Sequence, residues 1–139
     1  MQKVIEKAAV LIEALPYIQR FRNETIVVKF GGSIMDQETG VRSILNDVAF
    51  MACVGLRPVI VHGGGKLITH RMKEAGLKAV FLKGLRVTDE QTIHIVERVL
   101  NQEINPHMVE LLGSFGCRAR GLHGDDILSV QRHSENDAA

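Results

Sequence analysis

The sequence is poor in aromatic residues: it has no tryptophan, one tyrosine and five phenylalanines among 139 residues. Proteins that bind single-stranded nucleic acids stack the bases on aromatic side chains, and a nucleic-acid-binding surface is normally strongly basic. The formal net charge of this chain is only +1. The scarcity of aromatic residues and of excess positive charge therefore argues against a nucleic-acid partner.

Cysteine and long apolar segments are also scarce. Cys53 and Cys117 have no CxxC spacing, so we interpret them as buried thiols of a reducing compartment, not as a disulfide or zinc framework. No apolar run approaches the roughly 20 residues of a membrane-spanning helix. The N-terminal residues mix charged and apolar side chains, unlike a secretion signal. We therefore expect a cytoplasmic protein that does not bind a membrane.

Short apolar runs alternate with segments of helical periodicity, which predicts one α/β domain. Strands are expected at residues 25–30, 57–62, 79–82, 118–122 and 126–130, with 83–87 as a hairpin partner of the third. Helices are expected at residues 3–15, 36–53, 66–75, from 88 onward and 106–114. The first two strands are nearly continuous apolar runs, typical of strands buried on both faces of a parallel sheet.

Two helical segments carry further expectations. Residues 3–15 form one apolar stripe, which Pro16 interrupts before a second helical piece; the stripe could pack on the domain or on another subunit. "TDEQ" at 88–91 fits a capping box, with Thr88 capping the helix and Gln91 reaching back. The helix that follows has Ile93, Val96, Val99 and Leu100 on one side.

Two glycine clusters directly follow the first two strands, at 31–32 in "VVKFGGS" and at 63–65 in "VIVHGGGKLI". In open α/β sheets, ligands bind outside the carboxyl ends of the strands. A glycine turn between a strand and a helix exposes backbone N–H groups and a helix N-terminus, which together favour an anion. Lys29 would add positive charge at the same rim. We therefore predict that both turns face one anion-binding cavity.

Each of these features also has a simpler interpretation. Either glycine cluster alone could be a tight turn, and Lys29 could be an edge residue with its ammonium group in water. His62 could contact a substrate or be a structural histidine, and Arg86 could be an ordinary surface residue. Asp125 and Asp126 could bind a metal or only form a turn. The patterns GxxxxGK[ST] and GxGxxG are absent, so neither a Walker loop nor a dinucleotide fingerprint is predicted.

Three motifs in order, "VVKFGGS", "VIVHGGGKLI" and "GLRVTDEQTIHIVERVL", resemble the amino acid kinase family. Within it, the chain is most similar to the members that phosphorylate N-acetyl-L-glutamate in arginine biosynthesis, from about residue 9 to residue 131. The resemblance implies an α/β three-layer sandwich with a mainly parallel central sheet flanked by helices. It also implies ATP-dependent phosphorylation of the side-chain carboxylate of N-acetyl-L-glutamate. Position 66 departs from the family pattern, because it is lysine where many members have proline.

The resemblance implies roles for six residues, which are Lys29, Gly31, Gly32, Gly64, Gly65 and Arg86. The lysine would stabilise charge on the phosphoryl group during transfer, and the first two glycines would donate N–H groups to the ATP phosphates. The other two glycines would lie against the acid and the phosphoryl group, and the arginine would bind a carboxylate. The cofactor would be ATP with Mg²⁺, held largely by phosphate oxygens, so no protein metal site is expected.

The resemblance divides the chain into an N-terminal helical extension at 1–22, a substrate lobe at 23–131 and a flexible tail at 132–139. The family's chain continues into a second half that carries most of the ATP site. We therefore expect a truncated fold without the nucleotide lobe, and little or no activity for these residues alone. Members inhibited by arginine have an N-terminal helix that joins dimers into hexamers, and residues 5–21 resemble it. Arginine control and a homo-oligomer, either dimer or hexamer, are implied.

Two other functions remain open at this point. The chain could belong to another amino acid kinase, one that acts on aspartate or glutamate. It could also be a non-catalytic module that retains a pocket for an acidic ligand.

Overall fold

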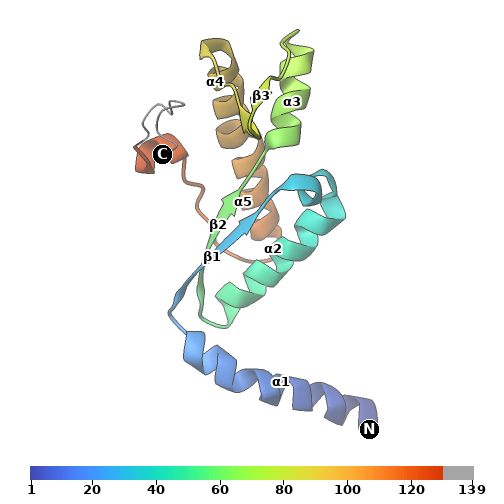
Figure 1. The fold of residues 1–139 in the computed structure, drawn as a ribbon. Helices are drawn as coiled ribbons and strands as arrows, with labels where there is room; N and C mark the ends of the chain where they lie inside the picture. The colour runs from blue at the N-terminus through green and yellow to red at the C-terminus, as the bar shows by residue number, and fades with distance from the viewer. Residues whose placement is uncertain (130–139) are drawn as a thin grey trace.

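The computed structural model describes residues 1–129 (Figure 1). Its elements in chain order are α1 (Gln2–Phe21), β1 (Thr25–Phe30), the 3-10 helix η1 (Gly32–Asp36), α2 (Glu38–Cys53), β2 (Arg57–His62), α3 (Gly65–Glu74), β3 (Phe81–Leu82), β4 (Leu85–Arg86), α4 (Glu90–Glu97), the π-helix η2 (Arg98–Ile104), α5 (Asn105–Ser114) and α6 (Gly124–Ile127). The chain has a mixed α/β fold with a parallel sheet flanked by helices, which confirms the predicted fold class.

β1 and β2 form the parallel pair, with Thr25 opposite Arg57 at one end and Phe30 opposite His62 at the other. The two strands are in full register, so their carboxyl ends meet at one edge of the sheet. Helix α2 connects them, as parallel strands require a crossover. Each glycine cluster therefore begins where its strand ends, and the two clusters become neighbours.

The hydrophobic core lies between the sheet and the helices. In Figure 1, α2 and α5 lie behind the two strands. The buried apolar side chains are Phe30, Val41, Leu45, Val48, Ala49, Ile68, Met72, Val99, Ile104, Met108, Leu111 and Leu112. The predicted inner face of α2 is confirmed, and so is its end at Gly55, which has a φ of 95°. The core thus fixes α2, α3 and α5 around the edge where the glycine turns lie.

The prediction that both strands are buried on both faces is wrong for this chain. Side chains alternate along β1 and β2, and those that point away from α2 are open. Val27 is 64% exposed, Val59 43% and Val61 48%. No described residue covers this face well enough to bury it. The apolar composition of the two strands therefore does not match the exposure of this face in residues 1–129.

Helix α1 is one continuous helix through Pro16, so the predicted break at that residue is wrong. Proline removes one backbone donor, but its fixed φ suits a helix and the neighbouring hydrogen bonds remain. The helix extends away from the sheet in Figure 1. Val10, Leu11 and Ile12 are 63–70% exposed, and Ile5 and Leu15 are 56% and 48% exposed, so the stripe does not pack on its own domain within residues 1–129.

The N-terminus of α4 is capped by Asp89, not by Thr88 as predicted. The Asp89 carboxylate accepts a hydrogen bond of 2.8 Å from the Thr92 N–H, and hydrogen bonds from the Thr92 side chain and N–H hold the pKa of Asp89 below its usual value. The capping shifts by one residue because an aspartate stands next to the threonine and is also a strong capping residue. The inner face shifts as well: Thr92 is buried, whereas Ile93 is 46% exposed.

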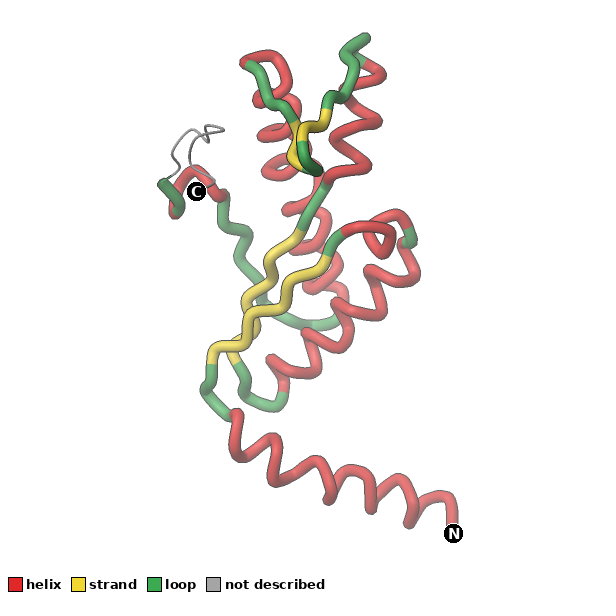
Figure 2. Tube along the Cα trace, viewed as in Figure 1, coloured by secondary structure: helices red, strands yellow, loops and turns green. Residues whose placement is uncertain are grey.

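The hairpin predicted after α3 is present, although it is shorter than expected. β3 and β4 pair antiparallel, with Phe81 opposite Arg86 and Leu82 opposite Leu85. The turn residues Lys83 and Gly84 both have positive φ. Figure 2 shows this hairpin at the end of the molecule opposite α1. The short pairing still matters for function, because it positions Arg86 against α3.

The strand predicted at 118–122 is absent: residues 117–123 have no regular secondary structure. The segment bonds to α5 instead of to a strand, since the Asn105 side-chain amide donates to the Leu122 carbonyl at 2.7 Å. The strand predicted at 126–130 is also wrong, because Gly124–Ile127 form a short helix; residue 130 and the predicted tail at 132–139 lie outside the described residues.

Two further observations concern the expected cellular setting. Both cysteines are free, but Cys53 is exposed and Cys117 half-buried, so the predicted burial of both thiols is wrong. Cys53 is the last residue of α2. Among residues 1–129, no helix combines the length and apolar character that crossing a membrane requires.

Candidate functional site

The two glycine turns lie against each other. The Gly63 N–H donates to the Phe30 carbonyl at 3.1 Å, which continues the parallel pairing of β1 and β2 by one residue. A Cβ added to Gly31 would lie 3.6 Å from the Gly63 Cα, so the two backbones are in van der Waals contact. Gly32 has a φ of 67°, which directs the chain into η1 and α2. The predicted proximity of the two turns is confirmed.

The three glycines of the second turn differ in their surroundings. Gly63 faces the Gly31 backbone. A Cβ on Gly64 would lie 2.7 Å from the Ile104 Cδ1 and 2.9 Å from the Leu100 Cδ2, so Gly64 lets helix η2 approach. A Cβ on Gly65 would meet nothing within 4 Å. Only Gly65 therefore leaves its space open to a ligand; the space at Gly64 is filled by the protein itself.

Both turns open onto one cavity of about 430 Å³. Its lining residues are Gly32, Met35, Glu38, Val41, Gly64, Gly65, Lys66, Leu67, Glu103, Ile104, His107 and Met108. Helix α3 begins at Gly65 without a side-chain cap. The N–H groups of its first turn have no acceptor inside the helix, so they present partial positive charge to this space. The cavity therefore has backbone N–H groups at its rim and apolar side chains in its wall.

Arg86 reaches this rim from β4. Its Nη2 donates to the Gly65 carbonyl at 3.0 Å and to the Thr69 Oγ1 at 2.7 Å, and its Nη1 contacts the Met72 Sδ at 3.1 Å. The guanidinium group also lies over the Phe81 ring, 4.7 Å from its centre. These contacts use both N–H groups of Nη2 and one of Nη1 within residues 1–129, so the Nε N–H and the second Nη1 N–H, which point in different directions, remain. Arg86 is thus fixed to the second glycine turn and is not an unattached surface residue.

Three of the six predicted site residues do not line the cavity: Lys29, Gly31 and Arg86. Lys29 is exposed on the open face of the sheet, together with Val27 and Val61. The expectation that its stem is buried is wrong, because the face it points to is open in residues 1–129. His62 is half-buried, and its Nδ1 lies 3.2 Å from the Gly63 carbonyl, a contact that supports the second glycine turn.

Three ionisable residues of the cavity wall were not anticipated from the sequence: Glu38, Glu103 and His107. Glu103 and His107 are four residues apart, the helical spacing that puts two side chains on one face. The buried Ile104 and Met108 have the same spacing one residue later. The helical spacing could therefore have shown that Glu103 and His107 share one face of a helix. Nothing in the local sequence indicated that this face lies against the glycine turns.

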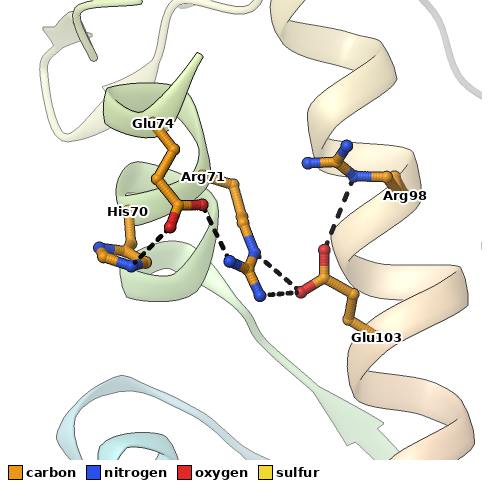
Figure 3. A network of polar contacts seen from close by, with 5 residues as sticks. All are labelled: His70, Arg71, Glu74, Arg98 and Glu103. Carbon is orange, nitrogen blue, oxygen red and sulfur yellow. Dashed lines mark hydrogen bonds and ion pairs between the residues drawn. The ribbon is translucent and has the colours of Figure 1, made fainter. Parts of the chain in front are cut away.

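Glu103 belongs to a polar network that joins α3 to η2 (Figure 3). The Arg71 guanidinium donates to one Glu103 carboxylate oxygen from Nε at 2.9 Å and from Nη2 at 2.8 Å. Its Nη1 donates to Glu74 at 2.8 Å. The Arg98 Nε lies 3.6 Å from the other Glu103 oxygen. Hydrogen bonds to Glu74 and Glu103 raise the pKa of Arg71 above its already high value, so the arginine is always charged.

Among residues 1–129, no group of three histidine, cysteine, aspartate or glutamate side chains could hold a metal ion. Asp125, which the sequence left open as one of a metal pair, accepts a hydrogen bond of 3.1 Å from the Asn101 side chain. It lies at the start of α6, where the "HGDD" stretch forms a helical turn. The turn interpretation of this stretch is therefore supported.

Comparison with known proteins identifies similar sequences along the chain. The amino acid kinase family matches residues 24–139. An acetylglutamate kinase from Akkermansia muciniphila is 44% identical over 97% of this chain and 46% of its own length. One from Campylobacter jejuni is 46% identical over 98% of this chain and 49% of its own length. The chain thus spans about half the length of these relatives.

A solved structure supports the fold as well. The crystal structure of smu.665 from Streptococcus mutans UA159 superposes with a TM-score of 0.64 at 31% sequence identity. The match covers 73% of this chain and 40% of that one.

Proposed function

The chain belongs to the amino acid kinase family, and we propose that it is the acceptor-binding half of an acetylglutamate kinase. The reaction would be ATP-dependent phosphorylation of the side-chain carboxylate of N-acetyl-L-glutamate, in the cytoplasm and in arginine biosynthesis. In this proposal, residues 1–22 form a helical extension, 23–131 the substrate lobe and 132–139 a tail. The similarity to curated acetylglutamate kinases over nearly the whole chain supports the choice of substrate.

One observation carries this proposal: the two glycine turns meet at the carboxyl edge of the sheet and line a single cavity. Phosphoryl transfer requires positioning and charge stabilisation more than covalent chemistry from the protein. Backbone amides of glycine turns and the N-terminus of α3 can supply both. The acceptor carboxylate is already ionised at neutral pH, so no general base is needed.

The geometry supports the proposed roles of some residues more directly than those of others. Gly65 would lie against the acid and the phosphoryl group, because its space is open. Arg86 would bind a carboxylate of the acid through its guanidinium group, whose planar geometry lysine cannot reproduce. Gly64 would contribute by letting the second turn sit close to η2. The role of Lys29 on the transferring phosphoryl group comes from the family resemblance, because Lys29 does not line the cavity.

The residues at the rim also fit the anionic part of ATP, which would supply the phosphoryl group in the complete enzyme. Gly31 and Gly32 would present backbone N–H groups to the phosphates, at a point where no side chain blocks the approach to Gly32. Mg²⁺ would rest on phosphate oxygens.

We further propose that the parent enzyme is a homo-oligomer, either a dimer or a hexamer joined through α1. The exposed apolar residues of that helix support this proposal. Arginine would act as a feedback inhibitor of the complete enzyme. Light scattering on the chain with and without residues 1–20 tests the role of α1, and an unchanged oligomer mass would contradict it.

Calorimetry on the 139-residue chain tests the substrate directly. We expect N-acetyl-L-glutamate to bind without ATP, and L-glutamate and L-aspartate to bind at least tenfold more weakly, because they lack the acetyl group. Arg86→Lys should weaken binding about tenfold, since it keeps the charge but loses the planar fork. Arg57→Lys is the matched control, because Arg57 lies at the opposite end of β2 and should leave binding unchanged.

Other outcomes would identify the alternatives. Preferential binding of aspartate or glutamate would indicate another amino acid kinase. Binding of all three acids with similar affinity, and no phosphorylation when the complete parent protein is supplied with ATP, would indicate a non-catalytic module for acidic ligands. No binding of any acid would contradict the proposal.

A further inference from the structure

The cavity that should receive an anion has a carboxylate in its wall. Glu103 lines the cavity and its side chain retains 26% of its exposure, so it is neither fully buried nor remote from the space a ligand would fill. A carboxylate within several ångströms of an anionic ligand opposes binding. The location of Glu103 therefore requires an explanation in a site of this kind.

The charges of the wall show the size of the problem. The charged side chains among the described lining residues are Glu38, Lys66 and Glu103, with the histidine of the wall counted as neutral. Two carboxylates and one ammonium group give these residues a formal charge of −1. Attraction of the ligand would then depend on the backbone amides and on Arg86 at the rim. Arg71 and Arg98 bring two positive charges to the surroundings of Glu103, and Glu74, which shares Arg71, brings one negative charge, so the sum rises from −1 to zero.

Arg71 and Arg98 are placed to make this correction. Arg71 donates twice to one oxygen of Glu103, at 2.8 and 2.9 Å, and Arg98 lies 3.6 Å from the other oxygen. Neither arginine lines the cavity within residues 1–129. Figure 3 shows both guanidinium groups directed at the same carboxylate, one from α3 and one from η2. Arg71 is the closer of the two, and its side chain is also the less exposed, at 34% against 52%.

We propose that Arg71 makes the cavity receptive to an acidic ligand by neutralising Glu103, without touching the ligand itself. This inference rests on the proposed function, since it assigns an electrostatic role at the same site. Helix α3, whose N-terminus forms the rim, carries Arg71 two turns further on. The pair therefore also fixes the rim against η2. A role in charge compensation and a role in positioning predict different ligand affinities when the charges of Arg71 and Glu103 are removed one at a time.

The experiment compares four variants of the 139-residue chain by calorimetry with N-acetyl-L-glutamate and, separately, with pyrophosphate. We expect Arg71→Gln to weaken binding of both anions about fivefold at low ionic strength, the effect of one uncompensated charge nearby in a solvated site. Glu103→Gln should bind as well as the wild type or better. The double variant should recover wild-type affinity. Arg57→Gln, which removes the same charge at the far end of β2, should have no effect.

Salt and a conservative variant separate charge from position. The deficit of Arg71→Gln should shrink to less than about twofold in roughly 0.5 M NaCl, because the added salt screens charges that are several ångströms apart. Arg71→Lys should retain most of the affinity. Urea denaturation of each variant verifies that it is folded, and the two-residue variant provides a folded reference that lacks both charges.

Each result has a definite meaning. A double variant as weak as Arg71→Gln, or a deficit that persists in high salt, would overturn the inference, because either result indicates a structural role. Binding of pyrophosphate but not N-acetyl-L-glutamate would reject the proposed acceptor while leaving the charge test intact. A wild-type chain that binds neither anion would reject both the proposed function and this role of Arg71.

Discussion

The two glycine turns occupy equivalent places at the ends of β1 and β2, yet their glycines are required for different reasons. In the first turn, Gly32 has a φ of 67° and a Cβ on it would meet nothing within 4 Å, so backbone conformation is the constraint. In the second turn, Gly64 has an ordinary extended φ but its space is occupied by Leu100 and Ile104. Gly65 is constrained by neither.

This difference shows that a glycine cluster is not one functional unit. Gly63 and Gly31 let two backbones touch, Gly64 lets a helix approach, and Gly32 turns the chain. Of the two cavity glycines with open space, Gly32 and Gly65, only Gly65 lacks a positive φ, so it is the position at which a ligand, and not the fold, would explain the missing side chain. Substitutions at these positions should therefore separate stability from binding.

The largest expected effect is a loss of stability at the second turn. Gly64→Val should lower the free energy of unfolding by about 2 kcal/mol, because the new side chain overlaps the packing of Leu100 and Ile104. Urea denaturation measures the change. Gly113→Val is the matched control, since a Cβ there would meet nothing within 4 Å. Equal stability of the two variants would show that η2 does not need Gly64.

The next effect should appear in binding and not in stability. Gly65→Ala should weaken binding of N-acetyl-L-glutamate about tenfold, or about 1.4 kcal/mol, by adding a methyl group to the open space. Its midpoint of urea denaturation should stay close to that of the wild type. Calorimetry and denaturation on the same sample test both halves of the expectation. Undiminished binding would mean that the ligand does not approach this glycine.

A smaller loss of stability is expected at the first turn. Gly32→Ala should cost about 1 kcal/mol, because an L-residue with a side chain is strained at positive φ. Gly32→Asn should cost less, since asparagine tolerates the left-handed region better than alanine. Denaturation of both variants tests the order. If alanine were as stable as asparagine, the conformation at this position would not be the constraint.

The smallest effect concerns the contrast between two helix N-termini. Helix α3 has no side-chain cap and presents its N–H groups to the cavity, whereas α4 is capped by Asp89. Hydrogen bonds from the Thr92 side chain and N–H lower the pKa of Asp89 in the folded protein. When the pKa of a carboxyl group is lower in the folded than in the unfolded protein, the ionised group stabilises the fold at any pH above its unfolded pKa, which is about 4 for aspartate. This stabilisation is lost as the pH falls through the folded-state pKa.

Asp89→Asn removes this titration while keeping a capping side chain. The difference in free energy of unfolding between wild type and Asp89→Asn should therefore be constant near about pH 7. Between about pH 4 and about pH 2, the wild type should lose more stability than the variant. Denaturation midpoints measured across this range test the sign. A difference that does not change with pH would contradict the proposed linkage.

Much of the fold could be predicted from local patterns. The apolar stripe of α2, the turn at Gly55 and the two parallel strands followed from periodicity and from glycine at the helix end. The segment at 117–123 could not be predicted in this way, because its sequence suits a strand but the Asn105 side chain takes the Leu122 carbonyl. The open face of β1 and β2 was also missed, since an apolar run does not reveal what covers it.

The candidate site, like the fold, could be predicted from the sequence only in part. The positions of the glycine turns at the strand ends followed from the sequence, because parallel strands align their carboxyl ends. The sequence could not indicate that Gly64 is packed against η2 or that Glu103 and His107 face the cavity. These contacts join segments far apart in the chain, and no short-range pattern encodes them.

The sequence by itself determined the order of strands, helices and glycine turns, because hydrophobic periodicity and glycine conformations act over a few neighbouring residues. This order also determined that the site lies at one edge of the sheet. Which glycine is left open, which face of η2 and α5 forms the wall, and which arginine compensates Glu103 depended on the packing of distant segments. Side-chain contacts and charges across a cavity exist only after those segments have met, so the tertiary structure alone decided them.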